Sequence, residues 1–167
     1  LGLERVIDLR QHSQHARGPG FLSPERTDHV PLVDRVIDLD DPPDLDEPAH
    51  ITDLYEAMLE RSREPLARVL GLVADHVERG PVLLHCAYGK DRAGLATALI
   101  HAAIGLPAEA IAADCARSHE PSVRRRQWVL AEPLLDDPPT ATLPPMLFTA
   151  HEMVMTALLS RAADRHG

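Results

Sequence analysis

The sequence predicts an α/β domain with a small, mainly parallel central sheet flanked by helices and a helical C-terminal third. Three observations support this prediction. Short β-branched runs alternate with helical patterns in the first half, one run is apolar without alternation, and the last third shows helical patterns only. A length of 167 residues suits one domain, so residues 1–167 are expected to form a single domain.

Two runs of identical sequence, Arg-Val-Ile-Asp-Leu at residues 5–9 and 35–39, predict the first strands. Both are short and β-branched, and polar or proline-rich stretches follow them. Their flanking residues differ and no third copy occurs, so two similar buried strands explain the recurrence better than a repeat architecture. Three prolines then predict a loop over residues 41–50, because proline removes backbone donors.

Helices are predicted to begin near Thr52 and at Pro65, since proline suits the first helical position. The second helix has one apolar face, which ends before Gly80 and is expected to pack on the sheet. This face consists of Leu66, Val69, Leu70, Val73 and Val77. Residues 81–85 follow as an apolar run without polar alternation, which is typical of a strand buried on both faces of a parallel sheet.

Helical patterns alone follow this strand. An apolar helix is predicted over residues 95–104, closed by Gly105, and another begins at Pro107. Further helical stretches contain Trp128 and residues 146–159. The apolar side chains of the last stretch favour core packing, with a homodimer contact through the C-terminal helix as the alternative. They are Met146, Leu147, Phe148, Met153, Val154, Met155, Leu158 and Leu159.

The composition limits the classes of function. The formal net charge is -9, from 17 basic and 26 acidic residues, which argues against nucleic acid as a partner because phosphate contacts need a basic face. An anionic substrate must therefore be bound by a local cluster of positive charge. The ten histidines lack the spacing of a metal site, so neither a metal nor a cofactor is predicted.

No apolar run approaches the roughly 18 residues that would predict a membrane span. The two cysteines, Cys86 and Cys115, are too few for a disulfide framework, and cytoplasmic localisation is expected. Cys115 lies in an alanine-rich helical pattern and is expected to be a small core side chain. The chain begins at Leu1 rather than Met, so secretion remains an alternative if an N-terminal segment is missing.

Residues 85–94 connect the apolar strand to the following helix and contain the candidate chemistry. Cys86 ends the strand, and Arg92 follows after five intervening residues. The backbone N–H groups between them can form a nest for an oxyanion at the N-terminus of the helix. Cys86 is expected to be largely thiolate there, because thiols at helix N-termini and beside cations ionise readily. Arg92 offers a planar guanidinium to two phosphoryl oxygens, and Gly89 gives the turn its freedom.

A phosphate monoester needs a nucleophile, donors for three phosphoryl oxygens, and positive charge. The loop supplies all three. Lys90 is expected to add charge at the rim, and His85 is expected to orient the loop by a hydrogen bond. The phosphate-binding residues beside Cys86 and Arg92 are predicted to be Ala87, Tyr88, Gly89, Lys90, Ala93 and Gly94.

This loop resembles the His-Cys-x-x-Gly-Lys-Asp-Arg-Thr-Gly loop of bacterial atypical tyrosine phosphatases, a group with dual-specificity and phosphoinositide-active members. Residues 6–10 are similar to an early strand of that family and residues 112–118 to a downstream helix, so the resemblance covers about residues 3–120. It implies the cysteine-dependent (tyrosine) phosphatase fold, a phosphocysteine intermediate on Cys86, and phosphate binding by Arg92. Lys90 and Asp91 would be the family's additional functional pair.

The resemblance leaves two sources for the general acid that protonates the leaving oxygen. One is Asp91 within the loop. The other is an aspartate of the proline-rich loop, where Asp41 aligns best among Asp38, Asp40, Asp41 and Asp44. Ala93 departs from the family, which has Thr or Ser there. That hydroxyl is thought to assist breakdown of the phosphocysteine, so its absence would slow turnover or indicate a different natural reaction.

These observations predict a metal-independent phosphomonoester hydrolase, similar to protein tyrosine and dual-specificity phosphatases, for a phosphoprotein or a phosphorylated small molecule. One alternative is an enzyme of a small phosphorylated metabolite, a nucleotide, sugar or lipid head group, acting by dephosphorylation, elimination or cyclisation. Another is a phosphate-binding module with little turnover. The presence of both Cys86 and Arg92 disfavours the module, because a pure binder needs no thiolate.

Overall fold

The computed structural model describes residues 2–18, 20, 22–33, 45, 47–131 and 144–166. The chain divides into two compact units, Leu1–Asp34 with Ala57–Ile100 and Arg35–Glu56 with His101–Gly167. The first unit contains the strands and the loop of residues 85–94, whereas the regular elements described in the second unit are helices. The single domain expected over residues 1–167 stays a prediction.

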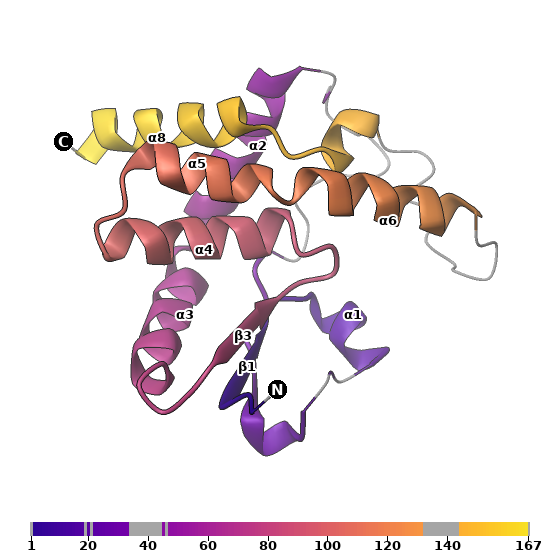
Figure 1. The fold of residues 1–167 in the computed structure, drawn as a ribbon, viewed down its shortest axis with the longest axis vertical. Helices are drawn as coiled ribbons and strands as arrows, with labels where there is room; N and C mark the ends of the chain where they lie inside the picture. Colours follow the sequence, from indigo (N-terminus) through magenta and orange to yellow (C-terminus); the bar gives the residue numbers. More distant parts are fainter. Residues whose placement is uncertain are drawn as a thin grey trace. The chain divides into compact units, whose positions relative to one another are not determined.

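The first unit is built on a three-stranded parallel sheet in the order β2-β1-β3, of which Figure 1 labels β1 and β3 side by side. Its strands are β1 (Arg5–Asp8), β2 (Thr27–His29) and β3 (Val82–His85). The strands predicted at residues 5–9 and 81–85 are confirmed, and so is the mainly parallel α/β class. The strand predicted at residues 35–39 lies outside the described residues.

The burial of the strands differs from the expectation in one respect. β1 has a partner on each side, and its Val6, Ile7 and Asp8 are 0% exposed. β3 was expected to be buried on both faces, yet all four of its residues are only partly buried. The reason is that β3 has a neighbour on one side only among the described strands. β2 is not predicted from the sequence, because its three residues are polar and become a strand by pairing with β1.

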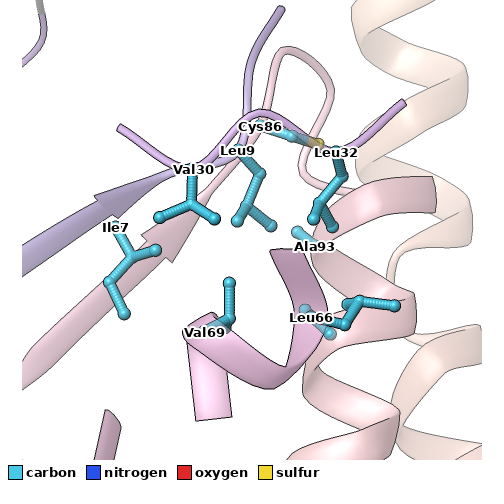
Figure 2. Close-up of a cluster of buried hydrophobic side chains, with 9 residues drawn as sticks. Ile7, Leu9, Val30, Leu32, Leu66, Val69, Cys86 and Ala93 are labelled. Carbon is cyan, nitrogen blue, oxygen red and sulfur yellow. The ribbon is translucent and has the colours of Figure 1, made fainter. Parts of the chain in front are cut away.

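Alternate residues of β1 face opposite sides of the sheet. Ile7 and Leu9 belong to a buried apolar cluster with side chains of α3 (Arg63–His76), drawn in Figure 2. Asp8 faces the other side, where it contacts α1 (His12–Ala16). In Figure 1, α3 and α1 accordingly lie on opposite sides of the strands. The rest of the buried cluster is Val30, Leu32, Leu66, Val69, Cys86, Ala93 and Ala96.

Helix α3 begins two residues before the predicted Pro65, and the apolar face that it buries ends earlier than predicted. Val77, the last residue of that face, lies at the C-cap and is 56% exposed. Helix α2 (Pro48–Arg61) also begins earlier than predicted, so residues 48–50 of the expected loop are helical. Proline suits the first helical position, because the N–H that proline lacks would have no hydrogen-bond partner within the helix.

Helix α4 (Asp91–Ala103) begins four residues before the predicted residue 95. Its first backbone bond runs from the Gly94 N–H to the Lys90 carbonyl at 2.7 Å. The predicted closure at Gly105 is confirmed, since this residue has φ 83 and the Leu106 N–H donates back to the His101 carbonyl at 3.0 Å. A left-handed glycine at this position is a common helix ending.

The second unit contains α5 (Ala108–Ala116), α6 (His119–Ala131), the 3-10 helix η2 (Pro145–Phe148) and α8 (Glu152–His166). In Figure 1, α5 and α8 run side by side. The expected core packing of the C-terminal apolar residues is confirmed for Leu147, Phe148, Val154, Met155 and Leu158, which are buried, but it is wrong for Met153, which is 61% exposed. The homodimer contact stays a prediction. Among the described residues, no helix combines the length and the apolar character needed to cross a membrane.

Candidate active site

The carboxyl ends of the three parallel strands meet at one edge of the sheet. Asp8 at the end of β1 lies in register with His29 of β2 and His85 of β3. The next residue of the central strand, Leu9, donates its N–H to the His85 carbonyl at 2.8 Å, so the chain segments that leave the sheet stay close. This edge is where open parallel sheets bind their ligands.

The loop of residues 86–92 begins at this edge. Cys86 is the first residue after β3 and is 8% exposed. Gly89 adopts φ 70, a left-handed conformation that favours glycine, and this turn lets its N–H donate to the Cys86 Sγ at 3.2 Å. Helix α4 then begins with the hydrogen bond from the Gly94 N–H to the Lys90 carbonyl. The Cys86 Sγ thus accepts a hydrogen bond from a backbone N–H of its own loop.

Arg92 lies in the first turn of α4 and reaches back to the connection between β1 and α1. Its Nη1 donates to the Gln14 Oε1 at 3.0 Å and to the Leu9 carbonyl at 3.4 Å. Neither bond uses Nε or Nη2, which a guanidinium can present side by side to two oxygens of one phosphoryl group. The guanidinium is therefore held at one end and can bind an anion through its other edge.

Lys90 differs from the expectation. It was predicted to add charge at the rim, but it is 4% exposed, and its Nζ pairs with the Asp91 Oδ1 at 2.7 Å. A buried ammonium needs such a counter-ion, because burial removes its hydration. Asp91 therefore stabilises the buried Lys90 within the loop, in addition to the general-acid role that the resemblance implies. Asp41, the other predicted acid, lies outside the described residues, as do Asp38, Asp40 and Asp44.

The predicted orienting residue, His85, lies between the loop and the sheet. Its Nδ1 is 3.4 Å from the Cys86 carbonyl, and its Nε2 is 3.9 Å from the Asp8 Oδ1. A ring held between these two oxygens would fix the start of the loop. This geometry agrees with the predicted role, which stays a prediction.

Asp8 is a buried carboxylate for which the sequence analysis proposed no role. Arg10 binds it through both carboxylate oxygens at 2.7–3.0 Å, and the His15 Nδ1 is 2.9 Å from its Oδ2. Burial by itself would raise the pKa of Asp8, but the bonds from Arg10 and His15 outweigh it and hold this pKa well below the usual range. Asp8 therefore stays charged and ties the sheet to the segment that contains α1.

Three histidines of this region pack ring against ring. The His15 ring stacks on His29 with 4.0 Å between centroids, and the His12 ring meets His29 edge-on at 5.0 Å. The His29 Nε2 also lies 2.8 Å from the Arg10 carbonyl. Within the described part of the chain, no group of three or more His, Cys, Asp or Glu residues could hold a metal ion. His12 and His15 lie on α1 and His29 ends β2, so these rings pack α1 against the end of that strand.

Two further residues considered from the sequence, Ala93 and Cys115, are both at least partly buried. Ala93, where the resembling family has a hydroxyl, is 8% exposed and belongs to the same buried cluster as Cys86 (Figure 2). Cys115 on α5 is partly buried, and burial, reinforced by Asp114, raises the pKa of its thiol to about 11. At neutral pH the Cys115 thiol is therefore protonated, which fits the small packing side chain predicted for it.

The partners that hold Arg92 were not predictable from its neighbours, because they precede it by more than 70 residues. Gln14 occupies the position where a helix-capping box has Glu or Gln, but Gln11 stands where that pattern has Ser or Thr, so the signal in the sequence was incomplete. Asp8 and Arg10 offered another signal, since charges at the end of a buried strand must be paired.

A parallel sheet whose carboxyl edge presents a Cys-x5-Arg loop at the start of a helix is the arrangement expected of cysteine-dependent phosphatases. Comparison with known protein families agrees, because the tyrosine phosphatase family matches residues 1–167. The chain belongs to this family. The resemblance inferred from the loop is therefore confirmed.

A search of characterised proteins finds a relative in the triple specificity protein phosphatase PtpB of Mycobacterium tuberculosis (strain ATCC 25618 / H37Rv). The two sequences are 40% identical over 81 residues, which are 46% of this chain and 28% of the relative. The match therefore spans less than a third of that protein. The family match places the chain among tyrosine phosphatases, the class of enzyme that the sequence predicts, and the relative is itself named as a protein phosphatase.

Proposed function

We propose that the chain hydrolyses phosphate monoesters with Cys86 as nucleophile and the loop of residues 86–92 as the phosphate site. The observation that supports this most is the bond from the Gly89 N–H to the Cys86 Sγ, with Arg92 held at the opposite end of the same loop. Substrates of the tyrosine and dual-specificity type, phosphoproteins or phosphorylated small molecules, fit the family and the name of the relative. Cytoplasmic localisation stays a prediction.

The proposed reaction has two steps and needs no metal or cofactor. In the first, the Cys86 Sγ attacks phosphorus, an S–P bond forms, and the P–O ester bond breaks as a general acid protonates the leaving oxygen. Arg92 and the backbone N–H groups of the loop bind the three remaining oxygens as their charge grows. In the second, water attacks phosphorus while the deprotonated acid accepts its proton, the S–P bond breaks, and inorganic phosphate leaves with the Cys86 thiolate and the acid restored.

The test is hydrolysis of an aryl phosphate by the full chain in the presence of a chelator. We expect turnover in wild type and none in Cys86→Ser, because an alcohol is far less ionised than a thiol at neutral pH. Cys115→Ser is the matched control and should retain full activity. Activity that survives in Cys86→Ser, or that disappears with chelator, would refute the proposed mechanism.

The proposed general acid is Asp91 or an aspartate of residues 38–44, with Asp41 preferred among them, and leaving-group dependence distinguishes these candidates. Removing the acid slows the ester of a poor leaving group, such as phenol, much more than that of a good one, such as nitrophenol, because only the poor one needs the proton. Asp91→Asn also removes the counter-ion of the buried Lys90, and that effect should slow both esters alike. The acid is the residue whose Asn variant slows the two esters unequally.

A second candidate reaction is supported by Ala93. Without a hydroxyl at this position, breakdown of the phosphocysteine can be slow, and the natural reaction can then be one in which a metabolite loses phosphate by elimination or cyclisation. Ala93→Ser adds one oxygen at a buried position and should fit with less strain than threonine. Faster aryl phosphate turnover in Ala93→Ser favours simple hydrolysis limited by the missing hydroxyl. Unchanged turnover favours the metabolite reaction.

A further inference from the structure

We infer that Gln14 is a positioning residue for Arg92: its neutral side chain fixes the guanidinium opposite Cys86 without cancelling its charge. The inference rests on the proposed function of the loop. Gln14 lies on α1 and Arg92 on α4, and their contact joins residues 78 positions apart. The contact at 3.0 Å is the shorter of the two that hold the Nη1 of Arg92.

The side chain of Gln14 is itself fixed. Its Oε1 accepts both from Arg92 and from the backbone N–H of Gln11 at 3.3 Å, so one oxygen uses its two lone pairs. The bond that fixes the Gln14 side chain therefore comes from the Gln11 backbone, which any residue at position 11 except proline would supply. Together with Arg92, this N–H holds Gln14 in the rotamer that reaches Arg92.

Helix α1 is only five residues long and needs support from its surroundings. The Arg10 guanidinium supplies it by donating from Nη2 to the Gly18 carbonyl at 2.6 Å while it binds Asp8. His15 bonds the same carboxylate from within α1. The contacts therefore run without a break from the central strand, through Asp8 and α1, to Gln14 and Arg92.

The amide of Gln14 has a chemical advantage over a carboxylate. A carboxylate at this distance would form an ion pair with Arg92 and draw its positive charge away from the phosphoryl oxygens. An amide oxygen accepts the hydrogen bond and leaves that charge for the substrate. Without Gln14, the contact that remains for Arg92 among the described residues is the 3.4 Å bond to Leu9, which is too long to fix a flexible side chain.

The test compares kcat and KM for an aryl phosphate in wild type, Gln14→Ala, Gln14→Glu and Gln11→Ala. Gln14→Ala should lower kcat roughly 10–100-fold, since a misplaced catalytic group costs up to about 100-fold. Gln14→Glu keeps the acceptor oxygen, so it should recover most of kcat but raise KM through its negative charge. Gln11→Ala keeps the backbone N–H that bonds the Gln14 Oε1, and therefore the contact to Arg92, so its kcat and KM should stay near wild type.

A double-mutant cycle separates positioning from general loss of structure. If Gln14 acts through Arg92, Gln14→Ala should have almost no further effect in an Arg92→Lys background. Equal losses in Gln14→Ala and Gln11→Ala, or an undiminished effect of Gln14→Ala in that background, would overturn the inference.

Binding of inorganic phosphate, measured by calorimetry, gives the inference a test that needs no turnover. Gln14→Ala should bind phosphate more weakly than wild type, and Gln11→Ala should bind it equally well. If wild type binds phosphate but hydrolyses nothing, the proposed function fails while this comparison still decides on Gln14. If Gln14→Ala binds phosphate as wild type does, the inference fails alone.

Discussion

Asp8 shows how one buried charge organises the neighbourhood of the candidate site. Its carboxylate is 0% exposed and receives hydrogen bonds from Arg10 and His15, with His85 also nearby. A buried charge is stable only when groups of opposite charge pair with it and hydrogen-bond to it. Because Arg10 and His15 also hold α1, the charge of Asp8 indirectly holds Gln14 beside Arg92.

The first prediction concerns Asp8 and pH. An unfolded aspartate binds a proton near pH 4, whereas the folded Asp8 has a lower pKa. The charge of Asp8 therefore contributes its full stability above about pH 5, and this contribution is lost as pH falls toward the folded pKa. Asp8→Asn should be less stable by about 3 kcal/mol at pH 7, because Arg10 loses its buried partner.

Urea unfolding at a series of pH values checks this prediction. The free energy of unfolding should fall more gently with acid in Asp8→Asn than in wild type, so the two curves converge at low pH. Parallel curves would show that the depressed pKa of Asp8 makes no contribution to stability.

The second prediction concerns the turn at Gly89. An alanine at φ 70 costs about 1–2 kcal/mol in backbone strain, although the added Cβ would meet no atom within 4 Å. Gly89→Ala should therefore lose about 1 kcal/mol of stability and also lose activity, because relaxing the turn moves its N–H away from the Cys86 Sγ.

Gly71 provides the matched control for Gly89. It lies inside α3, and a Cβ there also meets nothing within 4 Å. Alanine is the better helix former, so Gly71→Ala should stabilise the chain by about 0.5–1 kcal/mol and leave activity unchanged. Thermal unfolding and turnover of both variants give the comparison, and shifts of the same sign would contradict it.

At the scale of elements, α3 shows what periodicity can and cannot predict. The spacing of its apolar residues correctly predicts a helix that packs against the sheet. It does not predict where the contact stops, because that depends on the length of the strands. Val69 is 1% exposed, whereas Val77 on the same predicted face is 56% exposed.

The third prediction uses these two valines as a matched pair. Val69→Ala removes two buried methyl groups and should cost about 2 kcal/mol, from lost transfer free energy and the cavity left behind. Val77→Ala should change stability by less than about 0.5 kcal/mol. Chemical denaturation of both variants tests this, and equal losses would mean that α3 does not pack as described.

The loop of residues 85–94 was predictable because its features are contiguous in sequence. A strand pattern, a cysteine, a glycine, an arginine and a helix pattern follow one another, and each has a local physical meaning. The burial of Lys90 and the contact between Gln14 and Arg92 were not predictable in this way. Both depend on which segments the sheet brings together, and spacing along the chain does not encode that.

At the scale of the whole molecule, the net charge of -9 contrasts with the cations at the carboxyl edge of the sheet. Arg10 and Lys90 are each paired with a carboxylate, whereas both bonds that hold Arg92 go to neutral oxygens. An acidic protein can bind a phosphate group when one such arginine and a set of backbone donors converge on it. The composition alone argues against a nucleic-acid partner, but it does not identify the phosphate site.

The most direct measurement of the central claim is the identification of the covalent intermediate. The full chain is mixed with an aryl phosphate, quenched with denaturant during turnover, digested, and analysed by mass spectrometry. We predict one phosphate on the peptide that contains Cys86, none in Cys86→Ser, and a shorter-lived adduct in Ala93→Ser if the missing hydroxyl limits its breakdown. Turnover without any phosphate on Cys86, or with phosphate on another residue, would contradict the account.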